Sequence, residues 1–249
     1  MDSVEKLTHI LKRLNAGEDP EKLRGEAQEF LASVDPADLS IAEQKLMEAG
    51  LAPEDLRHLC SAHLGMLGDE LDRFKKSLEP GHVIHTMVCE HDRILGFLDE
   101  LEKVNKKIQK MKNYRRKSGD FKTLMHIAEH LVGAEPHHKR EEEVLFPELE
   151  KRNVYGPPQV MRMEHEELRR RKKELRTLAK NADKIEFEEF KKKLDSTSRL
   201  IVMTLRDHIF KENNILYPTA LRVIEDKKIW DRMRAECDRI GYCCFTPKT

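Results

Sequence analysis

Apolar residues recur at intervals of three and four along most of this chain, which is the spacing of amphipathic helices. No stretch alternates with a period of two, and the helix-favouring residues Glu, Lys, Leu, Ala and Arg dominate. One inward stripe can be followed from Ile84 to Leu101, and another from Leu194 to Ile215. The pattern predicts four long helices, at about 82–112, 120–150, 158–181 and 186–224.

Short segments with turn-forming residues connect these helices. They are Asn113 to Gly119, Asn153 to Pro158, and Asn181 to Lys184. Because links of this length place consecutive helices side by side and antiparallel, we expect an all-α fold built around an up-down-up-down four-helix bundle.

The first 80 residues have a different organisation, with short helical stretches cut by turn signals. These signals are Gly17 to Pro20, Asp35-Pro36 and Gly50 to Pro53, and Glu79-Pro80-Gly81 marks the boundary with the long helices. We therefore predict a small N-terminal helical domain over 1–80, the bundle over 81–225 and a C-terminal tail over 226–249.

Gly133 and Pro136 fall in the middle of the predicted second helix. An interior Pro removes a helical hydrogen bond and costs roughly 3 kcal/mol. Either the helix kinks at this point, or a new helical segment begins with Pro136 in its first turn. We expect the kink.

Charge composition narrows the classes of partner. Lys and Arg together number 46, as do Asp and Glu, so electrostatic attraction does not favour nucleic acid or an anionic membrane. No apolar run has the length of a membrane span, and the N-terminus lacks the apolar core of a signal peptide. We therefore expect a cytoplasmic protein that binds neither nucleic acid nor membrane. The adjacent Cys243 and Cys244 suit a redox or metal role or an inert tail, and we expect the inert tail.

Two of the predicted helices carry polar residues at core positions, and these residues repeat. His137-x-x-x-Glu141-x-x-x-Leu145-Phe146-Pro147 reappears as His208-x-x-x-Glu212-x-x-x-Leu216-Tyr217-Pro218. A second repeat precedes each copy, as Met87-x-x-Glu90-His91-Asp92 and as Met161-x-x-Glu164-His165-Glu166. A His and a Glu four residues apart share one face of a helix. Four inward-facing helices could therefore bring four imidazoles and two carboxylates to one point.

This set has the composition of a metal site with two ions. Glu141 and Glu212 would each bridge both ions. A metal role also accounts for their inward positions, because a buried carboxylate without a partner is costly. The imidazoles would come from His91, His137, His165 and His208, with His138 and then His130 as candidates for further positions. Mixed imidazole and carboxylate ligands suit iron or manganese, whereas one zinc ion would need only three or four of these groups. The alternative is that each His–Glu pair is an ion pair on a helix surface.

Further residues flank the candidate ligands. The neighbouring acids are either acceptors for ring N–H groups or solvated charges, and for each one alone we expect a solvated charge. They are Glu90, Asp92, Glu142, Glu164 and Glu166. Tyr217, which follows the second motif, is expected to be a core aromatic.

These motifs resemble the hemerythrin-like, or HHE cation-binding, family of four-helix bundles. Residues His137 to Pro147 look like the family's H-x-x-x-E-E-x-x-L-F-P helix, and Asp207 to Pro218 are similar to its D-H-x-x-x-E-N-N-x-L-[FY]-P helix. The second form resembles di-iron proteins linked to repair of stress-damaged iron–sulfur clusters. The resemblance covers about residues 81–225. The first 80 residues and the Ile240 to Cys243 tail look like an uncharacterised domain that is often found beside such bundles.

The chain also departs from the family's known patterns. Oxygen-carrying members have H-x-x-x-H on the third helix, but Arg169 stands four residues after His165. Glu212 lies four residues after His208, where those members have an Asp at the fifth position. Residues 92–125 contain no His, although the cluster-repair relatives take one from this part of the chain. The chain therefore resembles a carboxylate-rich variant and not a reversible oxygen carrier. A ferritin-like site would need two E-x-x-H motifs within the bundle, and only Glu135 to His138 has that form.

The resemblance implies a non-haem centre with two iron ions, for which zinc or manganese could substitute. Such a centre would bind or react with a small diatomic or reactive oxygen or nitrogen species, in sensing, stress response or iron handling. Two alternatives stay open: a metal-stabilised module that binds a protein partner through its N-terminal domain, and a di-iron oxidase or peroxidase. These residues leave undecided whether the protein is an enzyme.

Overall fold

The computed structural model describes residues 3–15, 18, 22, 45, 78–114 and 118–247. The described residues form helices and connections, with no strand among them, which confirms the predicted all-α class. Helix α1 (Ser3–Asn15) belongs to the N-terminal part of the chain. The turn signals at Asp35-Pro36 and Gly50 to Pro53, and the short helices expected around them, lie outside the described residues.

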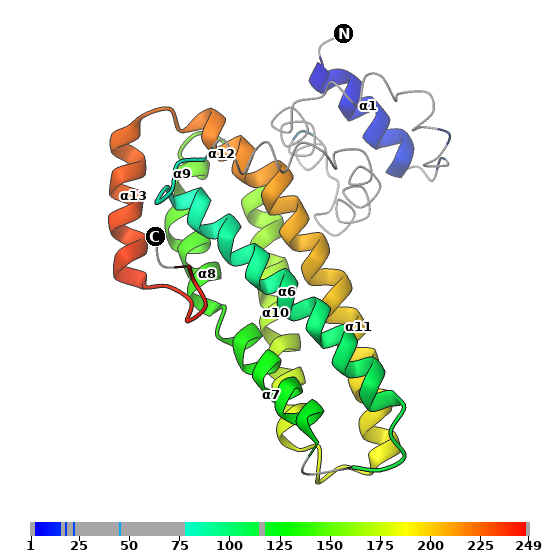
Figure 1. Cartoon of the computed structure of the whole chain (residues 1–249). Helices are drawn as coiled ribbons and strands as arrows, with labels where there is room; N and C mark the ends of the chain where they lie inside the picture. The colour runs from blue at the N-terminus through cyan, green and yellow to red at the C-terminus, as the bar shows by residue number, and fades with distance from the viewer. Residues whose placement is uncertain are drawn as a thin grey trace.

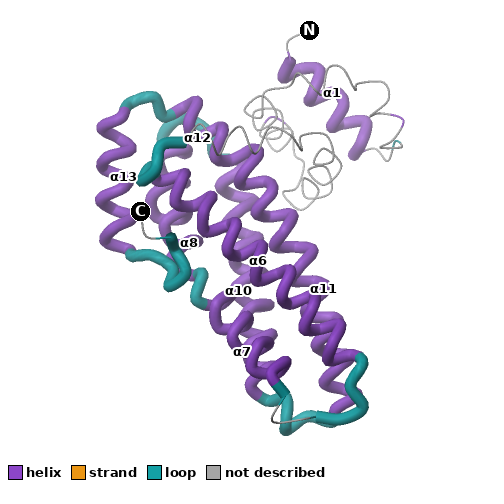
Figure 2. The backbone as a smooth tube through the Cα atoms, viewed as in Figure 1, coloured by secondary structure: helices purple, strands orange, loops and turns teal. Residues whose placement is uncertain are grey.

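Four long helices form the predicted bundle (Figures 1 and 2). They are α6 (Val83–Gln109), α7 (Gly119–Val132), α10 (Gly156–Lys180) and α11 (Phe187–Lys211). Helix α6 contacts α7 and α11, and α10 contacts the same two helices, so the four close a ring around one core. Figure 1 shows that consecutive helices run in opposite directions.

Local sequence sets where each helix begins. The side chains of His82, Ser118 and Glu186 accept hydrogen bonds from backbone N–H groups in the first turns of α6, α7 and α11. Helix α10 instead has Pro157 and Pro158 in its first turn. Backbone N–H groups in a first turn have no helical acceptor, so the N–H groups that the prolines lack cost the helix no hydrogen bond.

The second helix of the bundle is broken. Helix α7 ends at Val132, and a new segment, α8 (Glu135–Arg140), begins with Pro136 in its first turn. The structure therefore shows the second of the two alternatives that the sequence allowed, and not the expected kink in a continuous helix. The physical reason is that Pro136 cannot donate to the carbonyl of Val132, and a first-turn position does not require this bond.

Both His–Glu motifs end in a π-helical turn. The turns are η2 (Glu141–Leu145) and η3 (Glu212–Leu216), and α9 (Phe146–Glu150) and α12 (Tyr217–Val223) continue the helices beyond them. The backbone N–H groups of Phe146 and Tyr217 donate five residues back, to the carbonyls of Glu141 and Glu212. Pro147 and Pro218 follow directly, and the wider turn moves the preceding carbonyls away from their rings. Each Glu thus stands at the start of a local widening of its helix.

The core consists of two apolar layers with a polar layer between them. One layer gathers Ile84, Met87, Phe146 and Leu216 with neighbours from the same end of the bundle. The other is built along the long helices from residues such as Leu98, Leu124, Leu175 and Leu194. The candidate ligands lie between the two apolar layers, on α6, on α8 and η2, on α10, and on α11 and η3.

The C-terminal segment, expected as a tail over 226–249, contains a helix. Helix α13 (Lys227–Ile240) packs its buried Trp230, Met233 and Cys237 against the first apolar layer. Cys243 is buried and Cys244 is exposed, and both are free thiols. The domain boundaries themselves stay a prediction.

Candidate metal centre

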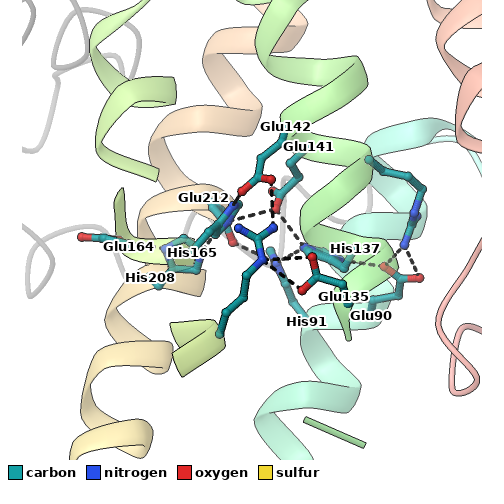
Figure 3. Close-up of polar contacts among 12 residues, drawn as sticks. Glu90, His91, Glu135, His137, Glu141, Glu142, Glu164, His165, His208 and Glu212 are labelled. Atoms are coloured by element: carbon teal, nitrogen blue, oxygen red, sulfur yellow. Dashed lines mark hydrogen bonds and ion pairs between the residues drawn. The ribbon is translucent and has the colours of Figure 1, made fainter. Parts of the chain in front are cut away.

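The polar layer brings together seven of the eight ligands predicted from the sequence, and Figure 3 labels all of these except His138. Helix α6 supplies His91, α8 supplies His137 and His138, α10 supplies His165, and α11 supplies His208. Glu141 and Glu212 reach the same layer from the two π-helical turns. Each of these seven side chains is at most 2% exposed.

On one side of the layer, His91 and His137 meet beside the two carboxylates. Their Nε2 atoms are 3.0 Å apart. Nε2 of His91 lies 3.1 Å from Oε2 of Glu212, and Nε2 of His137 lies 3.5 Å from Oε2 of Glu141. His91, His137 and Glu212 form a group whose donor atoms all lie within 4.8 Å of one another.

On the other side, His165 and His208 approach the same two carboxylates. Nε2 of His208 lies 2.8 Å from Oε1 of Glu212, and Nε2 of His165 lies 3.4 Å from oxygens of both Glu141 and Glu212. His138 stacks on His165, with ring centroids 4.0 Å apart and planes at 4°. His138, His165 and His208 form a second group with metal-ligand spacing, and Glu141, His165 and Glu212 form a third. Two sets of imidazoles therefore share one pair of carboxylates.

Four of the five imidazoles are oriented by an acceptor at their outer nitrogen. Nδ1 of His137 lies 2.7 Å from Glu90, Nδ1 of His165 lies 2.7 Å from Glu142, and Nδ1 of His208 lies 2.8 Å from Glu164. The expectation of solvated charges is wrong for these three acids, whereas Asp92 and Glu166 are exposed. Such outer acceptors orient a metal-binding imidazole and leave its inner nitrogen free to bind.

The fourth acceptor is not predicted by the sequence pattern. Nδ1 of His91 lies 2.8 Å from Oδ1 of Asn213, on a different helix and 122 residues away in the chain. No local pattern links the two positions, because the pairing depends on how α6 and the π-helical turn η3 face each other.

Cations hold the three outer carboxylates in their ionised form. Burial would raise the pKa of Glu90, but His137 and the Arg140 guanidinium, 2.7 Å away, lower it to about 2. The pKa of Glu142 is also lowered to about 2 against the effect of burial, by His165 and Arg169. Glu164 responds in the same way to His208 and Lys211, with a pKa of about 2. Each outer acceptor therefore keeps its negative charge towards the ring that it orients.

The inner atoms of the site fit a bound cation. The outer acceptors make Nδ1 the donor nitrogen of four of the five rings, so the Nε2 atom of each of these rings, when it carries no proton, points a lone pair at the centre. Among the described residues, none donates a hydrogen bond to the buried Oε2 atoms of Glu141 and Glu212. Burial lowers the pKa of His165, yet hydrogen bonds to Glu141, Glu142 and Glu212 raise it to about 10. The carboxylates thus attract positive charge into a dry core, as a metal site does.

Tyr217 is buried, as expected for a core aromatic, but its hydroxyl also reaches the centre. It donates a hydrogen bond of 2.7 Å to Oε1 of Glu141, and its ring stacks on His91 at 10°. Through this bond Tyr217 fixes the position of the Glu141 carboxylate at the centre.

His130 is not brought to the centre. It lies on α7, half-buried, with its ring against Phe97 and His126 at centroid distances of 4.8 and 4.1 Å. Two residues of irregular backbone separate α7 from α8, so the spacing of seven residues to His137 does not keep both rings on one face. His138, the first candidate for a further position, does lie at the centre.

Comparison with known sequences agrees with this architecture. The family model of the hemerythrin HHE cation binding domain matches residues 82–220, and that of a family of unknown function (DUF438) matches residues 7–73. No curated protein matches the chain. None of the described helices combines the length and apolar character needed to cross a membrane. The hemerythrin match spans more than half of the chain, over the helices that carry the candidate ligands, and the protein therefore belongs to the hemerythrin HHE cation-binding family.

Proposed function

We propose that this protein is a non-haem di-iron protein whose centre binds or reacts with a small oxygen or nitrogen species, in sensing, stress response or iron handling. The observation that carries the proposal is the pair of buried carboxylates, Glu141 and Glu212, shared between two groups of imidazoles. Two groups around one shared pair suit two ions better than one, because a single ion cannot use all of these donors.

The ligands divide between two ions. His91 and His137 would bind one ion, and His138, His165 and His208 the other, with Glu141 and Glu212 bridging. Iron held by imidazoles and carboxylates is redox-active and accepts small molecules at open coordination positions. Zinc and manganese are expected substitutes, since both accept the same donor types.

Two measurements test the proposal. Elemental analysis of the iron-reconstituted protein should find two ions per chain, and a protein without metal after reconstitution would overturn the proposal. The anaerobic absorption spectrum of the iron-loaded protein should then change on addition of oxygen, nitric oxide or peroxide. A stable adduct supports sensing, and turnover supports the oxidase or peroxidase alternative. An unchanged spectrum would favour a metal that only stabilises an interaction module. A protein partner bound through residues 1–80 and a cytoplasmic location stay predictions.

A further inference from the structure

The acid that orients His137 is held partly by a segment outside the bundle. Glu90 accepts hydrogen bonds from the ring of His137 and from the guanidinium of Arg140, both on α8. It accepts another from the hydroxyl of Thr246, which lies 156 residues farther along the chain and beyond the end of α13. Glu90 is 0% exposed. One buried carboxylate therefore connects a candidate metal ligand to the C-terminal end of the described chain.

The acids on the other side of the centre are held by cations of the bundle itself. Glu142 accepts a hydrogen bond from Arg169 of α10, and Glu164 accepts one from Lys211 of α11. Both cations lie on long helices that build the bundle. The contacts of the described residues thus connect the C-terminal segment to the group of imidazoles that contains His137.

Residues 241–247 form this connection, and we call them the C-terminal strap. Gly241 ends α13 with φ at 91° and ψ at −178°, a conformation that glycine adopts far more readily than other residues. The chain turns back there from α13 towards α8 (Figure 1). The guanidinium of Arg140 then lies over the ring of Tyr242, 4.6 Å from its centroid. Arg140 is therefore held between Glu90 on one side and the strap on the other.

Apolar contacts fasten the strap to the long helices. Cys243 is 5% exposed and belongs to the second apolar layer. Phe245 packs edge-on against Phe97 of α6, with ring centroids 5.4 Å apart, and lies 6.1 Å from the ring of His130 on α7. The backbone N–H of Thr246 donates to the carbonyl of Cys243 at 3.0 Å, which closes a turn. His130 thus forms part of the surface on which the strap rests.

We propose that the C-terminal strap is a positioning element of the metal centre, and that it sets how firmly the ion of His91 and His137 is held. Thr246 fixes an oxygen of Glu90, and Tyr242 packs on the cation that pairs with Glu90, so this acid keeps the His137 ring in one orientation. An imidazole that is oriented in this way binds its ion more tightly and releases it more slowly. The inference rests on the proposed two-ion centre, and it adds that the two ions leave the protein at different rates.

Release of zinc from the fully loaded protein to excess chelator tests the strap. The wild type should release zinc in two phases, one for each ion. Thr246→Val keeps the shape of the side chain but removes its hydroxyl, and it should speed one phase roughly threefold to tenfold, because hydrogen bonds to carboxylates are strong. Thr246→Ser keeps a hydroxyl and should release zinc as the wild type does. Phe245→Ala loosens the strap without removing a hydrogen-bonding side chain, and it should speed the same phase.

The matched control is Thr177→Val on α10. The hydroxyl of Thr177 bonds a carbonyl of its own helix at an exposed position, so its loss should change neither phase. Single-ion variants then assign the phases. In His165→Ala, where the ion of His91 and His137 is expected to remain, Thr246→Val should speed release. In His91→Ala it should not, whereas a merely structural role of the strap would speed release in both.

Four results would overturn the proposal: equal release from Thr246→Val and the wild type, equal acceleration of both phases, slow release that Thr246→Ser does not restore, or a single phase in the wild type. Elemental analysis before chelation distinguishes failure of the strap from failure of the di-iron proposal. A protein that holds two ions, with release independent of Thr246, refutes the strap alone. A protein that holds fewer than two ions refutes the two-ion centre and the strap with it.

Discussion

The Nε2 atoms of His91 and His137 lie 3.0 Å apart in the core of the bundle. The opposite nitrogen of each ring is engaged by an outer acceptor, Asn213 for His91 and Glu90 for His137. Two inward lone pairs at this distance repel each other unless a cation or a proton is shared between them. The protein therefore holds these rings in an arrangement that is favourable only with positive charge at the centre, and the stability of the bundle should depend on its metal.

Chelation should leave the protein folded but lower its melting temperature. The two apolar layers keep the helices packed, while Glu141 and Glu212 lose their counter-charge and must take up protons or water. A ligand at a thousand-fold excess over its Kd contributes about 4 kcal/mol. For a chain of this size that corresponds to a fall of roughly 10 °C. Circular dichroism before and after chelation, and after iron is added back, measures the change. An unaffected melting temperature would place the metal outside this core.

Loss of metal should open the protein locally. The segment from His137 to Glu141 lies between the α7–α8 break and a π-helical turn, so few regular helical hydrogen bonds hold it. Hydrogen exchange of the chelated protein should show lost protection in this segment. Helix α6 provides the internal control, because its helical hydrogen bonds are continuous and its protection should change less.

The role of the bridging carboxylates in metal binding can be distinguished from the effect of removing any nearby acidic residue. Glu141→Ala and Glu212→Ala should each abolish binding of the two-ion centre, because each carboxylate faces both groups of imidazoles. Glu143→Ala is the matched control, since Glu143 lies in the same π-helical turn as Glu141 but is exposed. Metal content after iron reconstitution is the measurement. Full two-ion occupancy in both bridging variants would show that the assignment of these residues is wrong.

Single histidine substitutions should remove one ion preferentially. His91→Ala affects the group that contains His137, whereas His165→Ala affects the group that contains His138 and His208. Each variant should therefore retain close to one ion per chain. His126→Ala, at an exposed position on α7, should retain both. If the two ligand variants kept both ions, the division into two groups would be incorrect.

Glu90 should be important for both stability and metal binding. Its carboxylate receives the ring N–H of His137, the guanidinium of Arg140 and the hydroxyl of Thr246 from the C-terminal segment. Glu90→Gln leaves Arg140 buried without its counter-charge, which costs about 3–5 kcal/mol. Metal affinity should fall roughly 10–100-fold, because His137 loses its charged acceptor. Denaturant unfolding and metal titration measure the two effects.

A double variant and a surface control complete this test. Glu90→Gln combined with Arg140→Met should recover part of the lost stability, since neither charge is then buried alone. Glu100→Gln, an exposed substitution on the same helix, should change neither quantity. Equal stability of Glu90→Gln and the wild type would contradict a structural role for the buried charge pair.

The sequence by itself determined the class of fold and where its chemistry is concentrated. The apolar spacing located both ends of α6 and of α10, the start of α11 and the end of α12 to within about three residues. A helix that packs on a core must repeat its apolar face every turn, and this repeat can be followed in the sequence. The repeated His–Glu motifs put polar residues at core positions, and this repeat alone located the polar layer of the bundle. This information is local, and local spacing is what a sequence records directly.

Only the tertiary structure decided which side chains meet across the bundle. The pairing of Asn213 with His91, and the presence of His138 but not His130 at the centre, both depend on how neighbouring helices are rotated and shifted against each other. The break at Gly133 and Ala134 rotates the face of α8 relative to that of α7. The two π-helical turns change the directions of the Glu141 and Glu212 side chains. Periodicity tells which face of a helix is buried, but the partners of that face come from distant segments, and only packing of the whole core selects them.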